Sequence, residues 1–271
     1  AMVMILGPLL ISNFMGGRTM VEAYQLGIVM MAVPGLLLCY AAVYAVDEKR
    51  YCRNRPSSLP LKESFKRTVT NKNFLIYLIG YMALWFYFNI LRSTSVSMAI
   101  VLAGGSEQFA SLLFVVVIGT AALCFPLAAV LAVRVGKKRI VLAALLGFVL
   151  SGVLFALTGI VPVPPKGWML FSGIASAFSV AVVIIIPNVM LSEISQRDAL
   201  TSGEHREAMF FGVQGFFMKL NLGLSGAVIA GFYSAFGRDI AQPLGVRLTP
   251  LAGAAVALVG FFVMTAYREQ R

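Results

Sequence analysis

Long runs of apolar residues constrain the fold of this chain more than any other feature of its sequence. A helix that crosses a bilayer needs about 20 mostly apolar residues. Such runs occur near residues 1–16, 24–46, 74–103, 109–133, 140–161, 168–192, 209–235 and 250–267. They are too long and too uniformly apolar for barrel strands, which alternate over roughly 10 residues. In lipid, backbone N–H and C=O groups must be hydrogen-bonded within the protein, and helices are the alternative to a closed barrel. The sequence therefore predicts an all-α, polytopic membrane protein.

The composition agrees with this prediction. Of the 271 residues, 59% are hydrophobic and 12% are charged, whereas a soluble domain has about 45–50% apolar and roughly 25% charged residues. The cysteines Cys39, Cys52 and Cys124 have no paired spacing, so we expect neither a disulfide nor a metal site. The predicted spans contain no Ser/His/Asp set and no carboxylate pair. We therefore expect neither an enzyme nor a bound cofactor.

The net charge of +11 is distributed unevenly between the two sides of the predicted membrane protein. With eight spans, sixteen Lys and Arg residues fall in loops on one side and four in loops on the other. Cytoplasmic loops carry the excess of Lys and Arg. We therefore expect a multi-pass protein of the cell inner (plasma) membrane, with the 47–73 loop and the C-terminus in the cytoplasm. The basicity then reflects topology, and nucleic acid is not an expected partner.

The 47–73 loop divides the predicted spans into two and six. Six spans after a long cytoplasmic loop match one half of a transporter that is built from two six-helix halves. We therefore expect residues 1–46 to form the last two helices of an N-terminal half. Residues 74–271 would form a six-helix C-terminal half, and four helices that precede residue 1 would be missing partners of this chain.

Part of the 47–73 loop has a helical period. Leu61, Phe65 and Val69 recur at i, i+4 and i+8, with Lys and Arg residues between them. This pattern suits a short amphipathic helix on the inner leaflet of the membrane. A disordered basic linker is the alternative, and the sequence does not decide between them.

The helix of the 209–235 span has a possible start upstream of its apolar run. Thr201 and Glu204 have the spacing of a capping box, in which two side chains satisfy backbone amides reciprocally. The sequence therefore predicts that a helix begins there, with Gly203, His205 and Arg206 in its first turn at the cytoplasmic surface.

Charged residues near the cytoplasmic ends of the spans form a candidate gate or latch. Arg206 is placed to pair with Glu193 or Glu207, and so to hold two helices in one conformation. Gly136 lies in a very short basic loop that ends at Arg139, where glycine allows two helices to turn tightly. The alternatives are an ordinary solvated loop and a topology anchor. The latch candidates are Glu193, Gly203, Arg206, Glu207, Gly136 and Arg139.

Two cations, Lys219 and Arg92, lie well inside predicted spans. At 1.5 Å per residue, Arg92 is about 15 Å from the outer end of its span, too far for easy snorkelling. Intramembrane cations are costly and usually face a cavity with a partner. No acidic residue lies deep in a predicted span, so we expect the partner in the missing helices or in an anionic substrate. A structural pair between the two halves is the alternative.

Polar and aromatic residues accompany both cations. From Tyr81 to Ser93, aromatic and hydrogen-bonding side chains recur at helical spacing beside Arg92 and share one face. Such a face suits a sugar, whose ring has apolar faces and hydroxyl edges, although packing explains it equally well. Further polar residues accompany Lys219. The candidates for a substrate or cation site are Lys219, Arg92, Trp85, Asn89, Tyr81, Gln214 and Asn221.

Segment 192–219 resembles the glycoside–pentoside–hexuronide:cation symporter family (melibiose permease-like, major facilitator superfamily). The matching elements are Glu193, Gly203, Arg206, Glu207, Phe211, Gly212, Gln214 and Lys219, together with Gly136–Arg139 and Asn71–Phe74. The chain departs from the family pattern at Gln196 and Arg197, and at His205, where an arginine is common.

The resemblance implies a major-facilitator-type helix bundle and a secondary active transporter. It implies cation-coupled symport of a sugar, glycoside or hexuronate by alternating access, with sodium or a proton as the coupling cation. The expected partners are thus a small-molecule solute and membrane lipid. A lysolipid-like or other solute carrier of the same fold is one alternative, and a non-transporting membrane scaffold or sensor is another.

Overall fold

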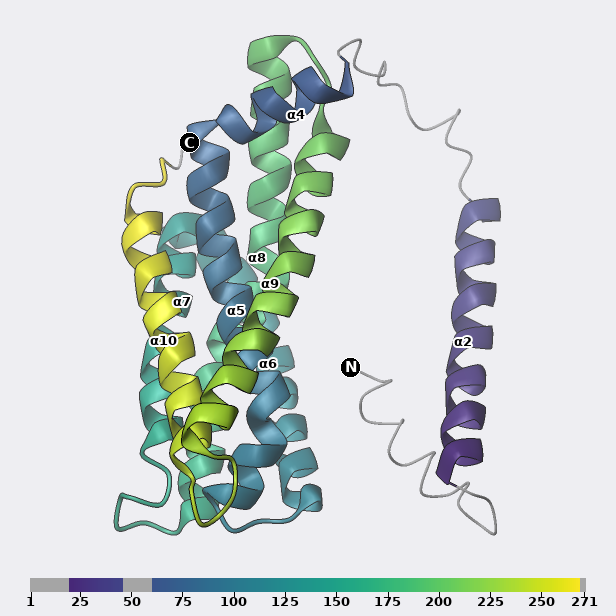
Figure 1. Cartoon of the computed structure of the whole chain (residues 1–271). Helices are drawn as coiled ribbons and strands as arrows, with labels where there is room; N and C mark the ends of the chain where they lie inside the picture. The colour runs from purple at the N-terminus through teal and green to yellow at the C-terminus, as the bar shows by residue number, and fades with distance from the viewer. Residues whose placement is uncertain (1–19, 46–59, 269–271) are drawn as a thin grey trace. The chain divides into compact units, whose positions relative to one another are not determined.

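The computed structural model of the chain describes residues 20–45 and 60–268 (Figure 1). The chain divides into two units, Ala1–Arg55 and Pro56–Arg271. The span expected near residues 1–16 lies outside the described residues. The assignment of the two sides of the 47–73 loop to two transporter halves stays a prediction.

Helices make up nearly all of the described residues, and no strand is present among them. The helices are α2 (Met20–Ala45) in the first unit and, in the second, α4 (Leu61–Thr70), α5 (Lys72–Val101), α6 (Glu107–Val135), α7 (Lys137–Ala156), α8 (Pro165–Ser202), α9 (Glu207–Phe236) and α10 (Leu244–Thr265). Within residues 20–45 and 60–268, seven helices are long and apolar enough to cross a membrane, α4 being the exception. The predicted all-α, polytopic fold is confirmed.

The six long helices of the second unit run alternately in opposite directions, so their ends gather at two opposite faces (Figure 1). One face holds α4, the α6–α7 and α8–α9 junctions and the C-terminal end of α10, and we call it the basic end. Its Lys and Arg residues are Lys62, Lys66, Arg67, Lys72, Arg134, Lys137, Lys138, Arg139, Arg197, Arg206 and Arg268. The opposite end of the described unit carries Lys166 in the first turn of α8, Arg238 between α9 and α10, and Arg247 in the first turn of α10.

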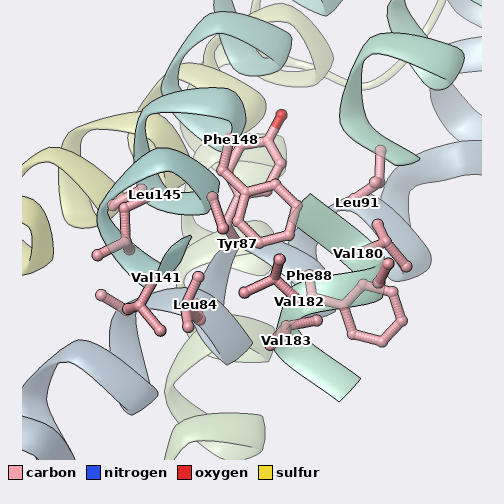
Figure 2. Close-up of a cluster of buried hydrophobic side chains, with 14 of the residues drawn as sticks. Leu84, Tyr87, Phe88, Leu91, Val141, Leu145, Phe148, Val180, Val182 and Val183 are labelled. Carbon is pink, nitrogen blue, oxygen red and sulfur yellow. The ribbon is translucent and has the colours of Figure 1, made fainter. Parts of the chain in front are cut away.

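Helix α5 lies inside the second unit and contacts all five of the other long helices. Figure 2 shows its apolar side chains meeting those of α7 and α8, with Tyr87 over Phe148. The two rings stack with their centroids 4.6 Å apart. The buried Tyr87 hydroxyl shares a hydrogen bond of 2.8 Å with Ser151, which satisfies a polar group that burial would otherwise penalise.

Small residues let α10 approach α5 and α7 closely. A Cβ at Gly260 would lie 2.2 Å from the Cβ of Ala83, and one at Gly152 would lie 2.7 Å from the Pro250 carbonyl oxygen. Membrane helices associate largely through close van der Waals packing, since lipid is as apolar as their side chains. These contacts therefore make α5, α7 and α10 one tightly packed layer.

The predicted helix start at Thr201 is wrong. Helix α8 continues to Ser202, and the Thr201 hydroxyl donates to the Arg197 carbonyl oxygen at 2.8 Å. Gly203 ends α8 in the left-handed region, at φ +71°. Hydroxyls in this last turn bond backwards within their own helix, and a left-handed cap favours glycine. Helix α9 then begins at Glu207.

The periodic part of the 47–73 loop forms helix α4, so the alternative of a disordered linker is wrong there. A single residue, Asn71, separates α4 from α5. Its backbone N–H donates to the Thr68 carbonyl oxygen, and its side chain accepts a 3.1 Å hydrogen bond from Phe74 N. Asn71 thus caps both helices, and α4 lies across the basic end (Figure 1).

Candidate functional site

A polar network joins α5, α8 and α9 near the basic end. The Tyr77 hydroxyl lies 2.9 Å from the Pro187 carbonyl oxygen and 3.0 Å from the Gln214 side-chain amide. The same amide lies 3.4 Å from that of Asn188. The Tyr77 hydroxyl faces two acceptor oxygens, the Pro187 carbonyl and Gln214 Oε1, and its single proton can point to either one. The Gln214 amide nitrogen donates to Asn188 Oδ1.

Aromatic rings continue along α5 from this network. Tyr77 stacks on Tyr81 with centroids 6.0 Å apart, and contacts of 6.2 Å and 5.5 Å link Tyr81 to Trp85 and Trp85 to Phe88. Trp85 is half-buried, and its indole N–H has no hydrogen-bond partner among the described residues. A buried donor of this kind is uncommon in proteins. The row thus combines flat apolar surfaces with an unused donor.

The two intramembrane cations stand apart from the polar network. At 1.5 Å per residue, Lys219 lies about 18 Å along α9 from Glu207, and Arg92 lies about 30 Å along α5 from Lys72. Both side chains are exposed on the second unit. Neither has an ion-pair partner in the part of the chain that the structure describes. The structure therefore does not bring the predicted cations and Gln214 together.

Lys219 stands on an open face of α9. Four glycines lie on this helix, and a Cβ at any of them would meet nothing within 4 Å among the described residues. They are Gly212, Gly215, Gly223 and Gly226. In the described part of the second unit, nothing therefore covers this face of α9.

The remaining predicted site residues lie in different surroundings. Tyr81 and Asn89 are buried in the second unit. The Asn221 amide donates to the Met82 carbonyl oxygen at 3.0 Å and so ties α9 to α5. Sequence analysis missed Tyr77 and Asn188. Tyr77 lies one turn before Tyr81, so the same spacing could have identified it.

The latch candidate Arg206 pairs with a residue that sequence analysis did not consider. Its guanidinium lies 2.5 Å from the Asp198 carboxylate, so the predicted pairing with Glu193 or Glu207 is wrong. Because α8 extends to Ser202, Asp198 stands beside the start of α9. Arg206 is 5% exposed, and its Nε and Nη1 have no hydrogen-bond partner in the described chain. The pair therefore joins the end of α8 to the start of α9.

Glu193 instead pairs with α7. Its carboxylate lies 2.7 Å from Lys137 Nζ, so the pair connects α8 to the first residue of α7. Gly136 is the one residue between α6 and α7, and its φ of +103° favours glycine. Arg139 is exposed in the first turn of α7. The short basic loop thus allows the tight turn expected of it and also supplies an ion pair.

A cavity of about 580 Å³ opens at the basic end between α5, α8 and α10. Both paired carboxylates, Glu193 and Asp198, line it, together with Arg197 and Arg268. The Asn73 side chain bonds both the backbone N–H and the carbonyl of Arg268, which fixes the adjoining end of α10. The carboxylates of both ion pairs, Glu193 and Asp198, therefore border this cavity near the helix ends.

Membrane-length helices, a polar network between them and charged contacts at one end define a multi-pass α-helical membrane protein. Residues 1–268 match the family described as MFS/sugar transport protein, and the chain belongs to that family. It is therefore a transporter of the major facilitator superfamily. Comparison with curated proteins gives no match. The expected superfamily is confirmed.

Proposed function

We propose that the protein is a secondary active transporter that couples the uptake of a sugar, glycoside or hexuronate to sodium or protons. The observation that carries this proposal is Lys219, a cation about 18 Å along a membrane-length helix that has no ion-pair partner among residues 20–45 and 60–268. A cation near the bilayer centre costs roughly 2.5–3.5 kcal/mol by insertion scales. Such a residue is retained when an anionic partner or substrate meets it.

The surrounding chemistry supports a sugar-like solute. The aromatic row of α5 offers flat apolar surfaces, and its Trp85 indole N–H is a donor with no partner in the described chain. Binding pockets for small molecules combine such apolar walls with a few placed polar groups. The carboxylate of a hexuronate, or a carboxylate that titrates with the coupling cation, suits Lys219 and Arg92.

The ion pairs at the basic end support alternating access. Lys137–Glu193 holds α7 to α8, and Arg206–Asp198 holds α8 to α9. In our proposal these pairs face the cytoplasm of the cell inner membrane, in accordance with the charge bias of the loops. They stabilise one arrangement of the helix ends, and solute binding shifts the population toward the other.

Uptake measurements test this function. Cells that express the protein are given radiolabelled neutral sugars or hexuronates, with an imposed sodium or proton gradient. Lys219→Gln should abolish gradient-driven accumulation, because the charge that meets the anionic partner is gone, and Lys219→Arg should retain part of it. Lys166→Gln, which removes an exposed cation at the opposite end, is the matched control.

Two outcomes would contradict the proposal. Accumulation that does not depend on either gradient would exclude coupling. Uptake of lysolipids but not of sugars would favour the lysolipid-like carrier. An unchanged accumulation in Lys219→Gln would remove the observation on which the proposal rests.

A further inference from the structure

Helix α4 buries small polar side chains against the protein and leaves two of the three residues of its apolar stripe exposed. Val69, the third, is half-buried and packs against the core. Ser64 and Thr68 are buried where α4 contacts α5 and α9. Leu61 and Phe65 are 79% and 47% exposed. An amphipathic helix on a water-soluble protein buries its apolar stripe instead. The environment outside α4 is therefore expected to be apolar.

Two lysines continue the outward apolar face. At 3.6 residues per turn, Lys62 and Lys66 follow Leu61 and Phe65 around the helix, on the side away from Ser64. Both are exposed, and neither has an acidic partner in the described chain. The acidic residue of α4, Glu63, pairs with Arg67 in the same helix. The two lysine charges are thus available to another partner.

The depth of α4 relative to the bilayer follows from its junction with α5. Only Asn71 separates the two helices, and it is hydrogen-bonded to both. Since α5 is a membrane-length helix that starts at Lys72, α4 lies where α5 enters the bilayer. Helices with an apolar face and flanking lysines lie in this interface, with the apolar face about 5–10 Å into the boundary of headgroups and acyl chains.

We propose that α4 binds anionic lipid headgroups in the adjoining leaflet. Leu61 and Phe65 insert among the acyl chains, and Lys62 and Lys66 contact the headgroup phosphates. An anionic surface attracts each nearby lysine strongly enough to change local binding about fivefold. Together, the one-residue junction and this lipid contact hold the basic end of α5 at a fixed depth.

Fluorescence quenching in nanodiscs tests this proposal on the full 271-residue chain. Cys39, Cys52 and Cys124 are replaced by Ser, and Leu61→Cys carries a bimane label. Phosphatidylglycerol or phosphatidylcholine with brominated acyl chains serves as the quencher at equal mole fraction. We expect both lipids to quench the label, and the anionic lipid to quench it several-fold more. Thr70→Cys, exposed on the opposite side of α4, should be quenched weakly.

Variants that remove lysine charges test which residues cause the preference for phosphatidylglycerol. Lys62→Ser with Lys66→Ser should remove the preference for phosphatidylglycerol and bring the lipid beside the label to near the bulk composition. Lys166→Ser, at the opposite end of the unit, should leave the preference unchanged. Phe65→Cys supplies a second label position in case Leu61→Cys does not fold.

Three results would overturn the proposal. Equal quenching by the two lipids would exclude anionic recognition. An absence of quenching at both label positions would show that protein, rather than lipid, covers the face. A preference that survives removal of both lysines would assign the anionic lipid to other residues.

Discussion

The Tyr77 hydroxyl of α5 donates to the main-chain carbonyl oxygen of Pro187 in α8, across 2.9 Å. Proline has no N–H, so α8 loses one bond of its helical ladder at this residue. Tyr77 thus ties α5 to α8 beside an interruption in the ladder, and Gln214 adds α9 to the same point. One hydroxyl thus links three helices.

Tyr77→Phe should therefore lower both stability and solute affinity. We expect a loss of about 1 kcal/mol in unfolding free energy, the usual net value of a hydrogen bond, together with a weaker solute affinity. Tyr87→Phe is the matched control, because its hydroxyl is buried against Ser151 within the packed layer. It should lose similar stability and keep its affinity. Denaturant unfolding in detergent and equilibrium dialysis measure the two quantities.

The Arg206–Asp198 pair should contribute far more to stability than the exposed pair on α4. Asp198→Asn leaves a guanidinium that is 5% exposed without its counterion, which should cost about 3–5 kcal/mol. Glu63→Gln breaks the half-exposed pair with Arg67 and should cost less than about 1 kcal/mol. Equal shifts in the denaturant midpoints of the two variants would contradict this difference.

Close packing between α5 and α10 should make Gly260 intolerant of alanine. The added Cβ would lie 2.2 Å from that of Ala83, and such overpacking typically costs about 1–3 kcal/mol. Gly231→Ala, where a Cβ meets nothing within 4 Å, is the control. Ala83→Gly should rescue Gly260→Ala in a double-mutant cycle, and additive losses would show that the contact is not the cause.

Arg92→Gln should weaken binding of hexuronates selectively. The side chain is exposed and has no ion pair in the described chain, so its loss should leave folding and insertion unchanged. A charge-assisted hydrogen bond is worth about 1.5–3 kcal/mol, which is roughly 10- to 100-fold in affinity. Calorimetric titration with a hexuronate and the matching neutral hexose measures this. Unchanged affinity for both would remove Arg92 from the site.

Features that depend on neighbours along the chain could be predicted from the sequence. Apolar runs of membrane length predicted the long helices, because a span depends on local hydropathy alone. Gly136 as a tight turn and the helical period from Leu61 were likewise readable, since each follows from short-range geometry. Gln214 was identified because a polar residue inside a span is uncommon.

Tertiary structure alone decided which side chains meet. In lipid, the core face and the outer face of a helix are equally apolar, so periodicity does not show how each helix is rotated. That rotation brings Tyr77 to Pro187 and exposes Lys219. The extent of α8 beyond the apolar run then places Asp198, rather than Glu193, beside Arg206. These pairings depend on how helices that are distant in sequence pack against one another. Local sequence patterns do not predict this packing.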